Sequence, residues 1–146
     1  MLIEKDLLGL LYDEELLKHL PNIIRHDLEE ALYCSCFERP TAATMVALRA
    51  IEAALRQLYL SLKPGAKIKG INWKTIVNEL KELIKQQNIE AESLIGYLDH
   101  LREIRNTAEH PDKIFDQVEG EDTLIHACYA IREMYKIINK LQTKQT

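Results

Sequence analysis

The sequence predicts an all-α protein, and three observations support this fold class. Gly and Pro are scarce, with 5 and 4 copies in 146 residues, so few positions favour a break in regular structure. Leu, Ile, Ala, Glu and Lys are abundant, a composition typical of helical chains. Apolar residues recur three and four positions apart, and no stretch shows the alternation of apolar and polar residues that indicates a strand.

Three helices are predicted in the first half of the chain. Residues 3–19 have the spacing of a short amphipathic helix, which we expect to be an addition to the core domain. Asn22 is a candidate N-cap of a helix over residues 22–37. Thr41 is a candidate N-cap of a longer helix that extends to about Leu62. This longer helix has two apolar faces, which predicts a central position in the fold.

Three more helices are predicted after a loop. Residues 63–70 contain Pro and Gly and form a basic loop. Asn72 is a candidate N-cap of a helix over 72–87, and further helices are expected over 90–111 and 122–141. Among the helices predicted after residue 21, the first two precede the loop and the last two follow it, with short connections. This order predicts an antiparallel four-helix bundle with an additional short N-terminal helix.

Length and charge limit the classes of protein that fit. A chain of 146 residues with 47% hydrophobic content can bury the core of one domain. We therefore divide it into an N-terminal helical extension (1–21), a helical bundle (22–141) and a polar tail (142–146). The net charge of −4 argues against binding long nucleic acid by overall charge, although the Lys residues near the loop could contact phosphate locally.

Cysteines and hydropathy indicate the cellular setting. Cys34, Cys36 and Cys128 are an odd number in a chain without a secretory signal, which favours a reducing, cytoplasmic location. No apolar run approaches the roughly 20 residues needed to cross a bilayer, so we expect no membrane partner. The histidines show no recognised metal-ligand spacing and no second Cys/His pair follows Cys36, so the sequence predicts no metal and no cofactor.

The most informative stretch is 98–111, where one helix face changes from apolar to polar. A helix advances about 100° per residue, so the polar residues of this stretch share a face with the leucines that precede them. These polar residues are Arg102, Arg105, Asn106, Glu109 and His110. Charged groups do not enter a core unpaired, so the change from apolar to polar indicates either a functional site or an ion-paired helix end. In the second case Glu109 pairs with Arg105, and Pro111 ends the helix.

The residue types suit chemistry on a phosphodiester. His titrates nearest neutrality and can exchange a proton, whereas Arg is always charged and forks onto phosphate oxygens. Asn and Glu can orient either group. Together they could bind a phosphodiester and move the proton of a 2′-hydroxyl without a metal ion. On the preceding helix, Arg49, Glu52 and Arg56 form either a local ion ladder or a support in which Glu52 holds an arginine of the site.

These residues also carry a family resemblance. Arg105-Asn106-Thr107-Ala108-Glu109-His110 resembles the signature of the HEPN superfamily, an Arg and a polar residue followed by three others and His. The stretch 102–111 is similar to the Arg-x-x-x-Asn-x-x-x-His-Pro stretch of bacterial HEPN-like domains of unknown function, but Arg105 stands where these commonly have Gly. Leu48–Leu55 resembles the preceding helix of those domains, and the likeness covers about residues 25–138.

The resemblance implies a metal-independent endoribonuclease or RNA-binding domain of the kind that occurs in toxin–antitoxin, CRISPR-linked or other defence systems. His110 would be the acid–base or 2′-hydroxyl-positioning group, and Asn106 would tune the site. Either Arg105 or Arg102 would be the phosphate clamp. The residues expected to support them are Arg102, Glu109, Glu52 and Arg49.

The same resemblance implies the expected partners. HEPN domains are frequently dimeric, so we expect a second copy of the chain, an RNA substrate, and an antitoxin or nucleotidyltransferase-like protein. Two other functions remain open. One is a non-catalytic interaction or dimerisation module in which the Arg/His residues are structural, and the other is a bundle that binds a small anionic molecule or nucleotide.

Overall fold

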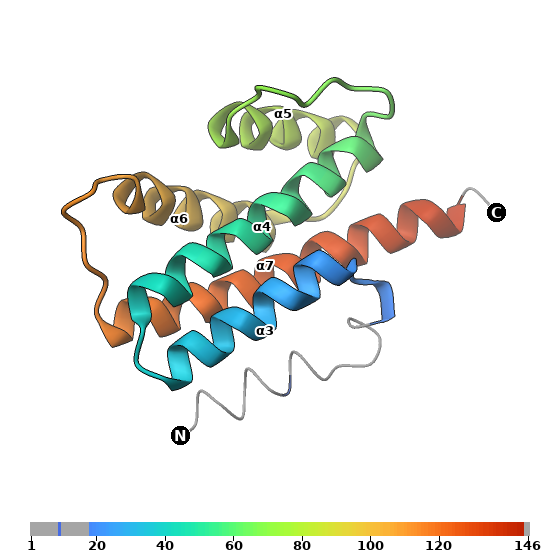
Figure 1. Ribbon diagram of the computed structural model, residues 1–146. Coiled ribbons are helices and arrows are strands. Elements are labelled where there is room, and N and C mark those ends of the chain that lie inside the picture. The colour runs from blue at the N-terminus through green and yellow to red at the C-terminus, as the bar shows by residue number, and fades with distance from the viewer. Residues whose placement is uncertain (1–8, 10–17, 145–146) are drawn as a thin grey trace.

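The computed structural model describes residue 9 and residues 18–144, so most of the helix predicted over residues 3–19 lies outside the described residues. The described part is all-helical and contains no strand, which confirms the predicted fold class. Within residues 18–144, five helices follow one another: α3 (Asn22–Cys36), α4 (Pro40–Leu62), α5 (Trp73–Gln86), α6 (Glu92–Ala108) and α7 (Gln117–Lys144) (Figure 1).

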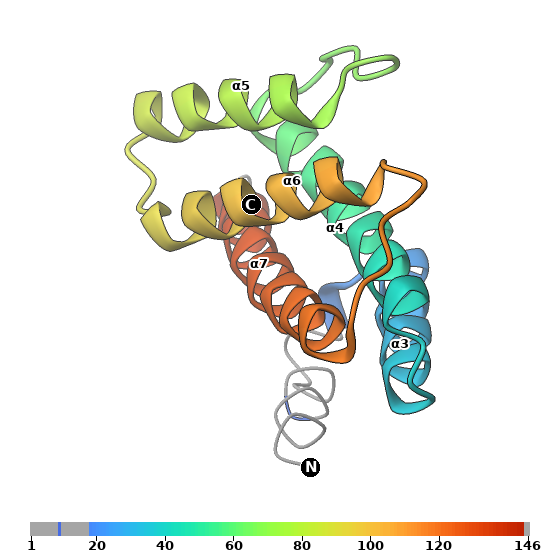
Figure 2. The ribbon, with the colours of Figure 1, turned by 90° about the vertical axis from the view of Figure 1, so that its left-hand side faces the viewer.

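Helix α4 is central, as its two apolar faces predict, because it packs against each of the other helices named above. Helices α3, α4 and α7 lie side by side, and α5 and α6 form a hairpin that packs against α4 and α7 (Figures 1 and 2). The alanines of α4 allow close approach, since Ala43, Ala47, Ala50 and Ala54 are fully buried. The core is thus built around a helix with a small-residue face.

The helix starts follow the predicted caps only in part. Asn72 caps α5 as expected, since its Oδ1 accepts a hydrogen bond from the Thr75 N–H at 2.9 Å. The prediction for Asn22 is wrong, because this residue is already inside α3 and Pro21 precedes the helix without a side-chain cap. Proline fixes a φ that suits entry into a helix, so α3 begins without a capping hydroxyl or amide.

Thr41 is also inside its helix rather than at the cap position. Helix α4 begins at Pro40, a favourable first residue because it has no amide hydrogen to leave unsatisfied. The Thr41 Oγ1 instead accepts a hydrogen bond from the Phe115 N–H at 3.1 Å. This bond joins the start of α4 to the segment that leads into α7.

Helix α7 begins at Gln117, earlier than predicted, because a reciprocal cap starts it there. The Glu119 N–H donates to Asp116 Oδ1 at 2.8 Å, and the Asp116 N–H donates to Glu119 Oε1 at 3.1 Å. The Lys113 ammonium also donates to Glu119, and this bond, with that from the Asp116 amide, lowers the pKa of the Glu119 carboxyl. The acidic segment after residue 116 is therefore helical, and α7 continues to Lys144.

The start of α7 lies directly against the start of α4. A Cβ added at Gly120 would meet the Pro40 Cβ at 2.9 Å and the Pro40 Cα at 3.1 Å. Gly120 is therefore required by close packing, although glycine weakens a helix. Gly96 on α6 provides a contrast, because a Cβ added there would meet nothing within 4 Å.

We predict opposite effects of alanine at these two helical glycines. Gly120→Ala should lower the free energy of unfolding by about 1–3 kcal/mol, because overpacking against Pro40 exceeds the gain in helix propensity. Gly96→Ala should raise it by about 0.4–1 kcal/mol, since only propensity and chain entropy change. Urea denaturation of both variants tests this packing. A Gly120→Ala protein as stable as Gly96→Ala would contradict it.

A buried thiol on α7 makes the free energy of unfolding fall as the pH becomes alkaline. Cys128 is 1% exposed, and burial raises the pKa of its thiol from 9.0 to about 12. Because the folded-state pKa is raised, the stabilisation is fully present below pH 9 and is lost as the pH rises toward 12. We expect ionisation of the Cys128 thiol to lower the free energy of unfolding by up to about 1.4 kcal/mol per pH unit in this range.

Cys128→Ala tests this assignment. The substitution should lower stability at pH 7 by removing buried volume, but it should make the decline of the unfolding free energy between pH 9 and 11 shallower. Chemical denaturation at several pH values measures both effects. Parallel declines in the wild type and the variant would show that the thiol is not responsible.

Candidate functional site

The polar end of α6 and the turn after it carry the residues of the predicted site. Helix α6 ends at Ala108, and the chain continues in a tight turn: the Glu109 N–H donates to the Arg105 carbonyl and the His110 N–H to the Thr107 carbonyl, each at 3.1 Å. Pro111 follows, which cannot donate such a bond and disfavours helical geometry in the residue before it. The helix stop therefore places His110 at an exposed corner.

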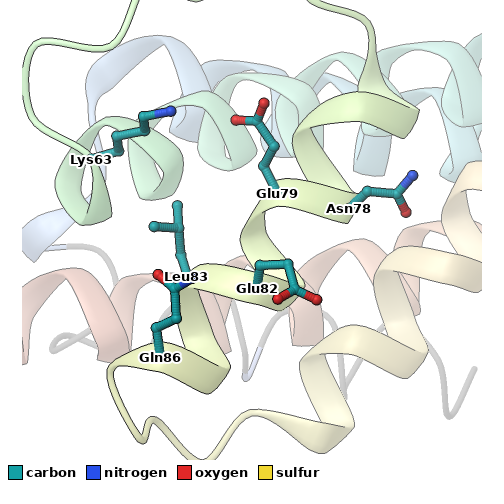
Figure 3. A pocket seen from close by; sticks show the side chains of 6 residues that line it. All are labelled: Lys63, Asn78, Glu79, Glu82, Leu83 and Gln86. Carbon is teal, nitrogen blue, oxygen red and sulfur yellow. The ribbon is translucent and has the colours of Figure 1, made fainter.

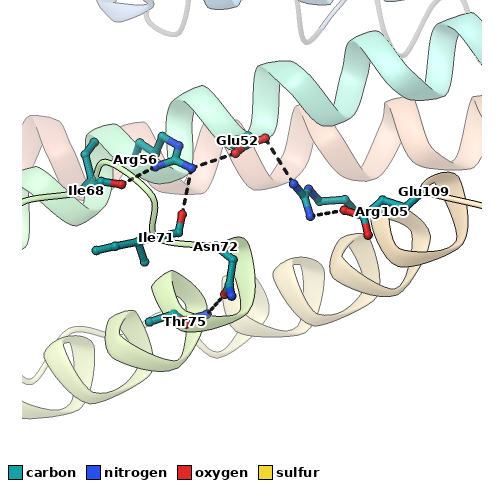
Figure 4. Close-up of polar contacts among 8 residues, drawn as sticks. All are labelled: Glu52, Arg56, Ile68, Ile71, Asn72, Thr75, Arg105 and Glu109. Atoms are coloured by element: carbon teal, nitrogen blue, oxygen red, sulfur yellow. Dashed lines mark hydrogen bonds and ion pairs between the residues drawn. The ribbon is translucent and has the colours of Figure 1, made fainter.

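Arg105 is held by three groups from three parts of the chain, and Figure 4 shows two of them, Glu109 and Glu52. Its Nη1 lies 2.8 Å from Glu109 Oε1, and its Nη2 lies 4.0 Å from Glu52 Oε2 on α4. Its guanidinium carbon lies 5.7 Å from the ring centre of the buried Trp73, a cation–π geometry. The expected Glu52–arginine pair is therefore present, but it is half-buried rather than buried, since the two side chains are 31% and 29% exposed.

Arg56 ties the basic loop to the same carboxylate. Its Nη2 lies 3.0 Å from Glu52 Oε1, so the Glu52–Arg56 part of the predicted ion ladder of α4 is present. The guanidinium also donates to the main-chain carbonyls of Ile68 and Ile71, each at 3.1 Å (Figure 4). The loop before α5 is thereby fixed beside the site, with the exposed Lys67 and Lys69 flanking Ile68.

Arg102 differs from Arg105 in having no anionic partner among the residues that the structure describes. Its side chain is half-buried, and its Nε is buried without a hydrogen-bond partner within the part of the chain that the structure describes. Buried polar groups are nearly always paired, and a partly desolvated cation without a counter-charge is costly. Arg102 is therefore the arginine of this cluster that can accept an anion without breaking an ion pair.

The remaining predicted residues divide between this cluster and another face. Asn106 and His110 are exposed, and neither side chain makes a hydrogen bond to any residue in the described range 18–144. Arg49 lies apart from the cluster, because its Nε pairs with Asp27 Oδ2 on α3 at 2.9 Å. Asp27 is 2% exposed, so Arg49 serves to neutralise a buried carboxylate.

Some contributors were not predicted as parts of the site. Trp73 was not among the predicted site residues, and Arg56 was predicted only as a member of an ion ladder. Trp73 contacts Arg105, and Arg56 contacts the loop carbonyls, across long separations in sequence. The periodicity of apolar residues therefore could not predict these contacts. Asp27 could have been found, because it lies three residues after Ile24 and one before Leu28 on the apolar stripe of α3.

A surface pocket of about 490 Å³ lies elsewhere, between the end of α4 and one face of α5 (Figure 3). Its lining residues are Lys63, Asn78, Glu79, Glu82, Leu83 and Gln86, and none belongs to the predicted site. Glu79 accepts a hydrogen bond from the buried Tyr59 hydroxyl, which raises the pKa of Tyr59. This carboxylate is thus engaged with the core.

We predict that Glu52 stabilises the site more than an ordinary surface carboxylate would. Glu52→Gln leaves the Arg56 and Arg105 guanidinium groups without their shared counter-charge, and should lower the unfolding free energy by about 1 kcal/mol. Glu29→Gln is the matched control, because Glu29 makes a single exposed pair with Arg25 on α3. It should cost no more than about 0.5 kcal/mol. Equal losses in urea denaturation would show that the shared contact contributes nothing extra.

Comparisons with protein families, with curated proteins and with solved structures find no match to this chain. Among the residues that the structure describes, no helix is both long and apolar enough to cross a membrane. The inference of function must therefore come from the chain's own side chains.

Proposed function

We propose that this chain is a HEPN-type, metal-independent endoribonuclease or RNA-binding domain, of the kind found in toxin–antitoxin and defence systems. The observation that carries the proposal is Arg102, which has no partner in the described part of the chain, beside a fixed Arg105, with Asn106 and His110 exposed at the end of the same helix. This set offers a place for a phosphate and a proton-transfer group next to it.

The two arginines have different parts in the proposed mechanism. Arg102 contacts a phosphate oxygen first, because its charge is not committed to a carboxylate. Arg105 joins when Glu109, which is 62% exposed, turns into solvent and releases Nη1. Glu52 and Trp73 keep the guanidinium in place meanwhile. The second cation then stabilises the extra negative charge of the transition state.

His110 supplies the proton chemistry. Its imidazole takes the proton of the 2′-hydroxyl or gives a proton to the leaving 5′-oxygen, and Asn106 orients the ring or the phosphate. Attack by the 2′-oxygen on the adjacent phosphorus breaks the bond to the 5′-oxygen and leaves a cyclic phosphate. The exposed Lys67 and Lys69 add positive charge for neighbouring phosphates of the strand.

The proposed assembly is a homodimer of HEPN-like bundles. Helices α3, α4, α6 and α7 alternate in direction along the chain and would be the four helices of the bundle, with α5 between them (Figure 1). Large apolar side chains are exposed where α3 ends and α7 begins: Phe37 is 76%, Ile114 81% and Val118 74% exposed. Such a surface suits a second copy of the chain, and it follows directly on the His110 turn.

A second candidate function is a non-catalytic interaction module. The observation that favours it is the pairing of Arg105 with both Glu109 and Glu52, which neutralises the cation in the free protein. In this alternative the cluster locks α6 against α4, and the exposed apolar residues bind another protein.

The test is RNA cleavage in EDTA by the wild type and by Arg102→Ala, Arg105→Ala and His110→Ala. We expect the arginine variants to lose activity by about a hundredfold to a thousandfold, since each removes a donor to the developing charge. His110→Ala should lose about a hundredfold to ten-thousandfold as a general acid–base group. Fluorescence of Trp73, the sole tryptophan, reports RNA binding beside Arg105.

Arg25→Ala and His26→Ala are matched controls on α3, where both residues are exposed. They should retain full activity. Light scattering and circular dichroism show whether each variant keeps its fold and oligomeric state. If the wild type cuts no RNA, and the site variants lose dimerisation or stability instead, the interaction module replaces the ribonuclease.

A further inference from the structure

A second polar cluster lies between α6 and α7, formed by His100, Asp122 and His126. The His100 Nε2 lies 3.1 Å from Asp122 Oδ2. The His126 Nδ1 lies 3.2 Å from Asp122 Oδ1 and donates a hydrogen bond to the Asp122 main-chain oxygen at 2.8 Å. The two imidazole rings are 4.7 Å apart between centroids and tilted by 55°. One ligand atom from each of the three side chains lies within 4.8 Å of the others. Two helices thus bring two imidazoles and a carboxylate to one point.

This geometry fits a transition-metal ion. Around a tetrahedral Zn²⁺ with bonds of about 2.0–2.1 Å, neighbouring ligand atoms are roughly 3.4 Å apart. The two His–Asp separations, which involve different oxygens of Asp122, are slightly shorter. With one ligand atom from each residue, a separation of 4.8 Å would need to close by about 1.4 Å. Binding through the His126 Nδ1 also requires that this nitrogen give up its hydrogen bond to the Asp122 main-chain oxygen. The side chains are 30–47% exposed, so they can make this adjustment and an ion can reach them.

The ligand set and its position also suit an ion. Two imidazoles and a carboxylate are a set that zinc and other first-row divalent ions prefer, and three protein ligands leave a position for water. Asp122 and His126 are one helical turn apart on α7, and His100 comes from α6. The Tyr97 ring packs edge-on against the His126 imidazole at 5.8 Å, which restricts that ring. A metal ion would therefore link two helices through side chains that already converge.

We propose that His100, Asp122 and His126 bind a divalent transition-metal ion such as Zn²⁺. The bound ion links α6 to α7. This site is separate from the proposed RNA site, because no hydrogen bond or ion pair within residues 18–144 joins its side chains to Arg102, Arg105 or Glu52. The ion stabilises the fold rather than taking part in RNA cleavage. Cleavage in EDTA and metal binding are thus independent observations, and either proposal can fail alone.

The experiment is calorimetric titration of the EDTA-stripped protein with Zn²⁺. Because Cys34 and Cys36 are thiols that zinc could also bind, the titrations use a Cys34→Ser/Cys36→Ser background. We expect one ion per chain, an increase in melting temperature with Zn²⁺ and no response to Mg²⁺, which prefers oxygen ligands. In this background, His100→Ala, Asp122→Asn and His126→Ala should each weaken binding by at least about tenfold.

His26→Ala is the control, because His26 also lies beside a carboxylate, that of Asp27, at 3.3 Å but has no second histidine there. It should bind Zn²⁺ as tightly as the background protein. The proposal is overturned if no Zn²⁺ binds, or if the three site variants bind it as well as the control does. In that case the cluster is a hydrogen-bonded His–Asp–His network only. Circular dichroism of the variants without metal verifies that each is folded.

Discussion

The carboxylate of Glu52 is the contact on which the arrangement around the site depends. It lies 3.0 Å from Arg56 and 4.0 Å from Arg105, so one anion from α4 serves two cations. Through Arg56 it fixes the carbonyls of the loop before α5, and through Arg105 it fixes the end of α6. Three segments that are distant in sequence are thereby joined at a half-buried point, where ion pairs are screened less than on an open surface.

Burial upstream on α6 makes this ionic end possible. Leu94, Leu98 and Leu101 are fully buried and position the helix against its neighbours before the face becomes polar. The helix then extends beyond the apolar core, and the same face carries Arg105 to Glu52 and Trp73. The hydrophobic effect thus sets the position of the helix, whereas the charges set the orientation of its last turn.

Local rules predicted the features that depend on neighbouring residues. The all-α class, the Asn72 cap and the Arg105–Glu109 contact follow from composition or from spacings of three and four residues. The sequence also contains the reciprocal cap of Asp116 and Glu119, which starts α7 at Gln117, whereas the helix was predicted to start only at residue 122. Helix ends are thus set by individual hydrogen bonds that hydropathy does not report.

Contacts between helices could not be predicted in this way. The packing of Trp73 on Arg105 and the convergence of His100 with Asp122 join residues from different helices, and their geometry depends on how those helices cross. A helical projection places side chains on a face but does not say which helix that face meets. Sequence reasoning therefore found the residue types of the proposed site without finding which arginine was already paired.

The difference between the two arginines is the physical argument for a binding site. If the cluster served only to join helices, each cation would be expected to have a partner, as Arg105 and Arg56 do. Arg102 has none within the described chain, although its Nε is removed from solvent. Retaining a partly desolvated charge costs stability, and binding an anion would recover that cost. The fixed arginine provides position and the unpaired one provides affinity, which together suit a phosphate that arrives from outside.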